Sequence, residues 1–135
     1  MGLSDFKLNA FIAVADMERA TAFYEGQLDL PVLRTDPDGS KVYASGGDES
    51  LVVYPSPDHA GQSTATLLTW YVDDVEAVVD ELTSNGVTFE RYEGVLESGF
   101  DYSTDEKGIS PRAGGGKVAW FKDPDGNLFS LEGDR

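Results

Sequence analysis

Residues 120–131, WFKDPDGNLFSL, predict a strand, a tight turn and a second strand. Pro124 presets its φ angle, Asp125 offers a side chain that hydrogen-bonds nearby backbone, and Gly126 tolerates a positive φ. The apolar residues on either side then favour two antiparallel strands joined by this turn. The stretch therefore marks the end of a β-rich unit.

Two earlier segments begin alike and indicate that this unit occurs twice. Residues 10–18 (AFIAVADME) and 68–76 (LTWYVDDVE) each predict a strand that leads into a helix. Asp16 and Asp74 lie 58 residues apart, and each is placed to cap the N-terminus of its helix. Such a repeat indicates two copies of one supersecondary unit.

Hydrophobic periodicity gives both copies the order strand, helix, strand, strand, strand. In the first copy we expect strands at about 8–14, 30–35, 41–45 and 50–54 and a helix at 17–26. In the second copy we expect strands at about 66–72, 87–92, 117–122 and 127–132 and a helix at 75–84. The sequence thus predicts an α+β fold with two tandem βαβββ modules, at about residues 5–56 and 66–133, and a linker at about 57–65. Residues 93–116 are either a lid or a surface loop.

Composition excludes several classes of protein. The chain has 135 residues, a length that fits one domain, and a formal net charge of −15 without a basic patch for nucleic acid. Cysteine is absent, so disulfides and thiolate chemistry are excluded. No apolar run is long enough to span a membrane, and residues 1–8 lack the apolar segment of a signal peptide, which leads us to expect a cytoplasmic protein without a membrane partner. The acidic charge serves either solubility or the attraction of cationic ligands.

Two βαβββ copies, the Val-x-Asp helix starts and the Asp-Pro-Asp-Gly-Asn turn together resemble the vicinal oxygen chelate superfamily. That group contains glyoxalase I, bleomycin-resistance proteins, fosfomycin-resistance enzymes and extradiol dioxygenases. The resemblance covers nearly the whole chain and implies a single domain over residues 1–135. It also implies a U-shaped, partly open sheet cup with helices outside, and a homodimer with clefts for small molecules.

The resemblance also implies where metal ligands would lie, and this chain departs from the pattern there. The corresponding positions are Asn9, Val53, Leu67 and Ser130. Two of these side chains have no lone pair, and an amide and a hydroxyl are weak neutral ligands. We therefore expect no metal and no cofactor. Two other residues are candidates for a displaced site, although His59 fits an exposed linker and Glu132 fits a solvated strand end.

Strand alternation assigns side chains to the inner face of the implied cup. We expect a ligand pocket formed by Asn9, Phe11, Tyr43, Val53, Leu67, Thr69, Tyr71, Phe100, Tyr102, Phe121, Ser130 and Glu132. Trp70 is expected in the core. The sequence does not decide on which face of its strand Trp120 lies, because a slip of one residue in the register would move the side chain to the other face. The alternative is that these side chains simply fill the cup.

Three hypotheses about function follow. The first is a metal-free protein that binds a small molecule, with an antibiotic among the candidate ligands. The second is a metal-dependent lyase, isomerase or dioxygenase-like enzyme of the glyoxalase type with a displaced metal site. The third is a structural or interaction dimer without a ligand. The sequence identifies no catalytic residue that would decide whether the protein is an enzyme.

Overall fold

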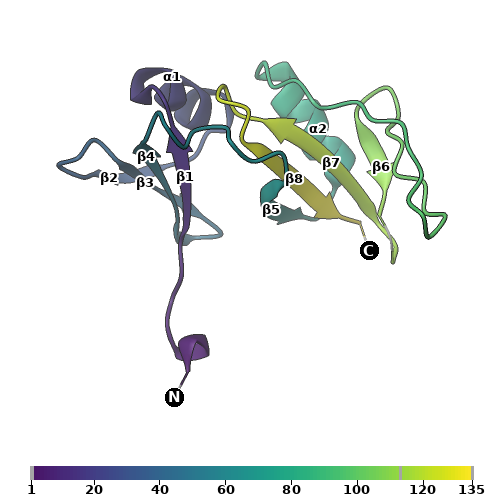
Figure 1. The fold of residues 1–135 in the computed structure, drawn as a ribbon, viewed down its shortest axis with the longest axis horizontal. Helices are drawn as coiled ribbons and strands as arrows, with labels where there is room; N and C mark the ends of the chain where they lie inside the picture. Colours follow the sequence, from purple (N-terminus) through teal and green to yellow (C-terminus); the bar gives the residue numbers. More distant parts are fainter. Residues whose placement is uncertain (1, 113, 135) are drawn as a thin grey trace. The chain divides into compact units, whose positions relative to one another are not determined.

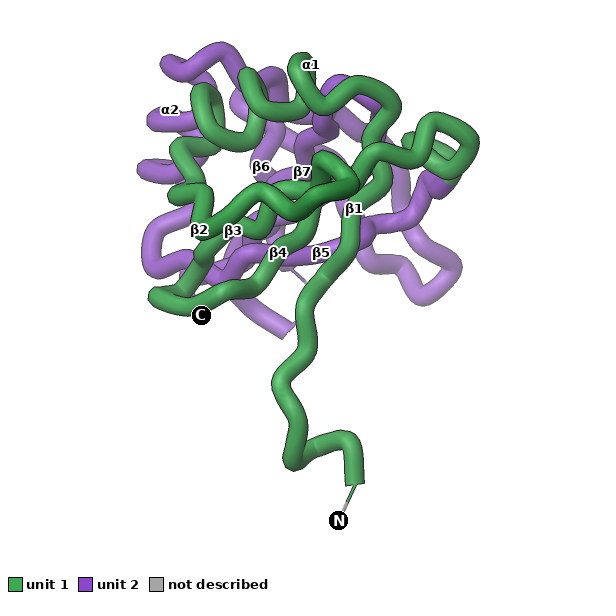
Figure 2. Tube along the Cα trace, turned by 90° about the vertical axis from the view of Figure 1, so that its left-hand side faces the viewer, with its two compact units in different colours: residues 1–62 green, residues 63–135 purple. Residues whose placement is uncertain are grey.

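A computed structural model of the chain describes residues 2–112 and 114–134. The chain divides into two compact units, Met1–Gln62 and Ser63–Arg135, here called the first and the second unit (Figures 1 and 2). Each unit contains one four-stranded sheet. The two units are described separately below.

The first unit begins with a short 3-10 turn, η1 (Leu3–Asp5), which leads into an extended segment (Figure 1). Its regular elements are β1 (Ala10–Val14), α1 (Met17–Thr21), η2 (Ala22–Gln27), β2 (Val32–Thr35), β3 (Lys41–Ser45) and β4 (Asp48–Pro55). The strand order is β1-β4-β3-β2, with β1 parallel to β4 and the other pairs antiparallel.

The helix expected at 17–26 is present but changes its winding. Asp16 caps its N-terminus, because the side chain accepts hydrogen bonds from the backbone N–H groups of Glu18 and Arg19. After Thr21 the helix widens to a π-helix, η2, in which the Leu28 amide donates to the Phe23 carbonyl over 2.9 Å. The wider turn buries both Phe23 and Tyr24. Helical periodicity alone gave no sign of this widening.

The second unit repeats the topology of the first. Its elements are β5 (Thr66–Val72), α2 (Val75–Ser84), β6 (Ile109–Pro111), β7 (Lys117–Lys122) and β8 (Leu128–Gly133). The strand order is β5-β8-β7-β6, with β5 parallel to β8 and antiparallel pairs beyond it. In both units the first strand is therefore an edge strand that lies parallel to the last. The prediction of an α+β fold with two tandem βαβββ-like modules is confirmed, and neither sheet closes on itself.

The strand expected at 87–92 is corrected by the structure. Within the described backbone, this segment is paired with β7 only by a single bridge, Phe89 to Phe121, and by one hydrogen bond from the Glu90 amide to the Trp120 carbonyl. At Tyr92 the backbone instead exchanges hydrogen bonds with Thr104, so the chain leaves the sheet. The edge position beside β7 is occupied by β6, which comes from the segment expected to be a lid or loop.

The core of the second unit is an aromatic cluster on one face of its sheet. The Phe121 ring lies 5.5 Å from that of Phe89, 5.7 Å from that of Phe129 and 6.0 Å from that of Trp70, measured between centroids. Phe121 and Phe129 are fully buried. Helix α2 packs against β7 and β8 and buries Val75 and Val79. The expected core position of Trp70 agrees with this cluster.

The turn between β7 and β8 is held by the side chain of Asp123. Its carboxylate accepts hydrogen bonds from the backbone amides of Asp125 and Asn127 and from the side-chain amide of Asn127. Asp123 and Asn127 are both buried. The turn thereby fixes the register in which Trp120 lies opposite Ser130 and Phe121 opposite Phe129.

No helix within the described residues is long and apolar enough to cross a membrane.

Candidate functional site

The other face of the second unit's sheet carries a cavity of about 580 Å³, here called the hollow. Its walls come from β5, β8, β7, the end of β6 and the segment before β6. They are mainly aromatic and aliphatic, with two hydroxyl-bearing threonines, one serine and one pair of charged residues. The lining residues are Thr66, Thr69, Leu96, Phe100, Tyr102, Pro111, Arg112, Val118, Trp120, Ser130 and Glu132.

Sheet register brings the floor of the hollow together. Thr69 on β5 pairs with Ser130 on β8, which pairs with Trp120 on β7. Paired residues on neighbouring strands point to the same face, so these three side chains lie in one row. Two residues further along β8, Glu132 extends the same face.

An irregularity at the beginning of β5 decides which of its first residues lines the hollow. The register shifts between Thr66 and Leu68, so strict alternation does not extend back beyond Leu68. As a result Thr66 lines the hollow, whereas Leu67, which we expected there, does not and is 42% exposed.

A hairpin in the segment before β6 forms one side wall. The Leu96 amide donates to the Phe100 carbonyl and the Tyr102 amide to the Gly94 carbonyl, and Gly99 adopts a φ of +91° in the tight turn. Leu96, Phe100 and Tyr102 all line the hollow. The Tyr102 ring lies against the backbone of Gly94, where a side chain on residue 94 would collide with it. The segment therefore acts as a wall of the cavity.

Four of the polar side chains in the hollow are paired with one another. The Thr69 and Ser130 hydroxyl oxygens are 2.6 Å apart, and Ser130 is only 2% exposed. At the end of β8 the Glu132 carboxylate forms an ion pair with the Arg112 guanidinium. Arg112 also donates from Nη1 to the Gly115 carbonyl over 3.3 Å. The hollow thus presents one hydroxyl pair, one ion pair and the hydroxyls of Thr66 and Tyr102 among apolar side chains.

Sequence reasoning found part of this lining. Thr69, Phe100, Tyr102, Ser130 and Glu132 were expected and do line the hollow. The sequence did not decide the face of Trp120. The structure places its side chain in the hollow, because the turn at Asp123 fixes the register of β7 and β8. Arg112 was missed, because no sequence signal shows that the end of β6 meets the end of β8.

Two other expected residues of the second unit lie elsewhere. Phe121 is a correction, since it is fully buried in the aromatic cluster on the opposite face. Its neighbour Trp120 faces the hollow, and adjacent residues of a strand point to opposite faces. Tyr71 is 79% exposed and borders a second depression of about 290 Å³ with Asp73, Asp134 and Glu132, the last of which also lines the hollow.

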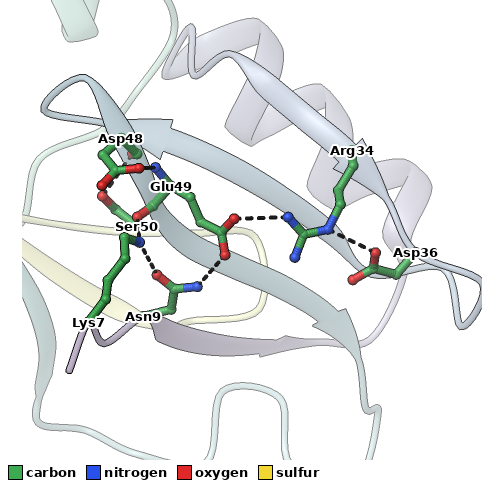
Figure 3. Close-up of polar contacts among 7 residues, drawn as sticks. All are labelled: Lys7, Asn9, Arg34, Asp36, Asp48, Glu49 and Ser50. Carbon is green, nitrogen blue, oxygen red and sulfur yellow. Dashed lines mark hydrogen bonds and ion pairs between the residues drawn. The ribbon is translucent and has the colours of Figure 1, made fainter.

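In the first unit, Asn9 belongs to a network of polar side chains (Figure 3). Its amide donates to Glu49 Oε2 over 2.8 Å and its carbonyl accepts from Lys7 Nζ over 2.9 Å. Arg34 bridges Glu49 and Asp36 at 2.9 and 3.1 Å. Hydrogen bonds from Arg34 and then from Asn9 hold the pKa of Glu49 below its ordinary value. Both the amide nitrogen and the carbonyl oxygen of the Asn9 side chain are therefore hydrogen-bonded within its own unit.

The remaining expected residues of the first unit are divided between the two faces of its sheet. Phe11 is 64% exposed and meets the Tyr54 ring edge-on. Tyr43 is fully buried, which is a correction to its expected place in a pocket wall. Its ring stacks on that of Tyr24 and its hydroxyl donates to Glu25 Oε2 over 2.9 Å. Burial, and then the hydrogen bond to Glu25, raise the pKa of Tyr43.

Register also corrects the position assigned to Val53. Phe11 corresponds to Thr69 in the repeat, and Phe11 pairs with Val52, as Thr69 pairs with Ser130. The counterpart of Ser130 is therefore Val52. Val53 pairs with Ile12 and is fully buried in the core of the first unit.

The positions that the resemblance gives to metal ligands do not fit a divalent ion. Asn9 is hydrogen-bonded to Glu49 and Lys7, Ser130 is bonded to Thr69, and Leu67 and either valine offer no donor atom. His59 bonds through Nδ1 to the Ser56 hydroxyl, and Glu132 is paired with Arg112. Across residues 2–112 and 114–134, no three His, Cys, Asp or Glu side chains form a group that could hold a metal ion.

One family model matches most of the chain. The model of the Glyoxalase/Bleomycin resistance protein/Dioxygenase superfamily matches residues 7–131. No curated protein sequence matches the chain.

Three solved structures illustrate the likeness of fold. A glyoxalase/bleomycin resistance protein from Catenulispora acidiphila DSM 44928 has a TM-score of 0.69 and 22% identity, over 96% of this chain and 99% of the other. A fosfomycin resistance protein from Listeria monocytogenes has a TM-score of 0.68 and 15% identity, over 96% and 93%. An antibiotic binding protein from Streptomyces sp. CB03234 has a TM-score of 0.66 and 24% identity, over 96% and 98%.

Proposed function

Since the chain belongs to the glyoxalase/bleomycin resistance protein/dioxygenase superfamily, we propose that it binds a small organic molecule in the hollow without a metal ion. The observation that carries the proposal is the hollow itself. Its volume of about 580 Å³ lies in the range of small-molecule sites, about 300–1,000 Å³. Its walls combine aromatic and aliphatic side chains with a few polar groups, which is the composition of such sites.

The chemistry of the lining favours binding over catalysis. Nucleophilic catalysis needs a nucleophile beside a base that removes its proton. The most buried hydroxyl of the hollow, that of Ser130, is bonded to another hydroxyl, that of Thr69. The carboxylate of Glu132 is held by Arg112. The described lining residues therefore supply no activated nucleophile, and their groups are suited to hold a ligand.

The proteins that resemble this chain support antibiotics as the class of ligand. One structure of similar fold is that of an antibiotic binding protein, and two families of resistance proteins share the fold. We propose that this chain sequesters such a compound by binding it reversibly. The aromatic walls formed by Trp120, Phe100 and Tyr102 suit a ligand with a flat ring system.

A thermal-shift screen tests the proposal. The protein is treated with EDTA and unfolded by heat in the presence of aromatic antibiotics of different charge. A compound that binds only the folded state adds about 2.7 kcal/mol of stability at a free concentration of about 100 times its Kd. We expect at least one compound to raise the Tm by several degrees with EDTA present. Stabilisation that appears only after Ni²⁺, Zn²⁺ or Mn²⁺ is restored would contradict the metal-free site and favour an enzyme of the glyoxalase type.

A further inference from the structure

The charge of the hollow differs from the charge of the chain. The whole chain carries a formal net charge of −15, which by itself favours cationic ligands. Among the lining residues, however, only Arg112 and Glu132 are charged at neutral pH, and their charges cancel. Among the described lining residues, Glu132 alone offers a carboxylate to a cation, and that carboxylate is already paired with Arg112.

The geometry holds this pair in place. Arg112 Nε lies 2.5 Å from Glu132 Oε1, and Arg112 Nη1 donates to the Gly115 carbonyl. The Arg112 backbone amide donates to the Gly116 carbonyl over 3.0 Å, so the turn that follows β6 fixes the base of the side chain. The two side chains are 22% and 25% exposed, so water screens the pair only partly. A cationic ligand would have to displace a guanidinium that is held by Glu132 and by the Gly115 carbonyl.

We propose that Arg112 determines the charge selectivity of the hollow, and that the hollow takes a flat aromatic ligand without net charge. This inference rests on the proposed function, because it names the ligand class of the same site. The aromatic walls supply ring contacts and the Thr69–Ser130 hydroxyl pair supplies the hydrogen bond for a carbonyl or hydroxyl of the ligand. Arg112 acts by neutralising Glu132, and the acidic surface governs only how fast charged molecules arrive.

Three probes of similar ring size and different charge test the inference. N-methylacridone is neutral, N-methylacridinium is a cation, and 9-anthracenecarboxylate is an anion. Their Kd values are measured by fluorescence titration at low and high salt, since salt suppresses attraction to the distant surface charges. We expect the native protein to bind the neutral probe about tenfold more tightly than either ion at high salt, a difference of about 1.4 kcal/mol.

Two single variants shift this selectivity in opposite directions. Arg112→Gln leaves the Glu132 carboxylate without its partner, and we expect it to tighten binding of the cation about tenfold at high salt. Glu132→Gln leaves the guanidinium without its partner, and we expect the same gain for the anion. The double variant restores a neutral hollow and the preference for N-methylacridone. Because the two single variants give independent readouts, the loss of one through misfolding leaves the other as a test.

Lys122→Gln is the matched control. It removes one positive charge from β7, as Arg112→Gln does from the end of β6, but Lys122 pairs with Glu90 at 3.4 Å and does not line the hollow. We expect its selectivity to match that of the native protein. Equal gains for the cation in Arg112→Gln and Lys122→Gln would overturn the inference, because net charge alone would then explain them.

The outcomes separate the inference from the function on which it rests. Binding of the probes with unchanged selectivity in both single variants, or tighter binding of the cation by the native protein at high salt, overturns the role of Arg112 and leaves a binding hollow. Absence of binding for all three probes, in the native protein and in the variants, contradicts the aromatic-binding hollow itself and with it the proposed function.

Discussion

Replacement of Phe121 by alanine is expected to lower the free energy of unfolding of the second unit by about 3–5 kcal/mol. Phe121 is fully buried and its ring meets those of Trp70, Phe89 and Phe129. The substitution removes a large apolar side chain and leaves a cavity that three aromatic neighbours fill only in part. Both tryptophans of the chain, Trp70 and Trp120, lie in this unit, so their fluorescence during urea denaturation measures the loss.

Phe11→Ala is the matched control for this prediction. It makes the same chemical change at a position that is 64% exposed, on β1 of the first unit. Because that unit contains no tryptophan, the urea denaturation of both variants is also followed by far-UV circular dichroism, which reports on both units. Surface substitutions of this kind usually change stability by less than about 0.5 kcal/mol. Comparable losses in the two variants would show that Phe121 does not anchor the second unit as its burial indicates.

Replacement of Trp120 by alanine is expected to weaken binding of the screened ligand about 30-fold, or about 2 kcal/mol. Trp120 is the largest side chain in the wall of the hollow and lies in the row that Thr69 and Ser130 form. Its removal takes away ring contacts and opens the site to water. Fluorescence or calorimetric titration of the ligand measures the change in Kd.

Two variants control for indirect effects of the Trp120 substitution. The Trp120 ring also contacts Tyr92, 5.3 Å away between centroids, so the change to alanine loosens one internal contact. Trp120→Phe keeps an aromatic ring that can contact both the ligand and Tyr92, so we expect it to retain most of the affinity. Tyr71→Ala removes an aromatic residue that is 79% exposed and does not line the hollow, so its Kd should be that of the native protein. Equal weakening in Trp120→Ala and Tyr71→Ala would place the ligand elsewhere.

The repeat was predictable because its signals are local. Asp16 and Asp74 cap α1 and α2 as expected; Asp16 accepts from two backbone amides of the first turn and Asp74 from one. Alternation identified the buried and open faces of β1, since Ile12 and Val14 are buried while Phe11 is exposed. Such patterns need only the chain itself, which is why the order of elements in both modules followed from sequence.

The departures from prediction come from contacts between segments far apart in sequence. The segment at 87–92 has strand-like composition, but the Tyr92 amide donates to the Thr104 hydroxyl, the Thr104 amide donates to the Tyr92 carbonyl, and β6 takes the edge of the sheet. The hollow depends on the same kind of contact. Arg112 meets Glu132 only because β6, β7 and β8 lie in register.

Faces of the sheet were predictable only where the register was known. Because the register of β5 shifts between Thr66 and Leu68, Thr66 lines the hollow in place of Leu67, which was expected there. The register of β4 replaced Val53 with Val52 as the counterpart of Ser130. A slip of one residue moves every side chain to the other face, and the sequence does not show such slips.

Backbone amide chemical shifts test most directly whether the hollow binds a ligand without a metal. EDTA-treated protein is titrated with the compound that gives the largest thermal shift. We predict that the changes centre on residues of the hollow, Thr69, Tyr102, Trp120, Ser130 and Glu132. Changes centred on Asn9 and Glu49 in the first unit, or changes that appear only after a divalent metal is added, would contradict a metal-free site in the second unit.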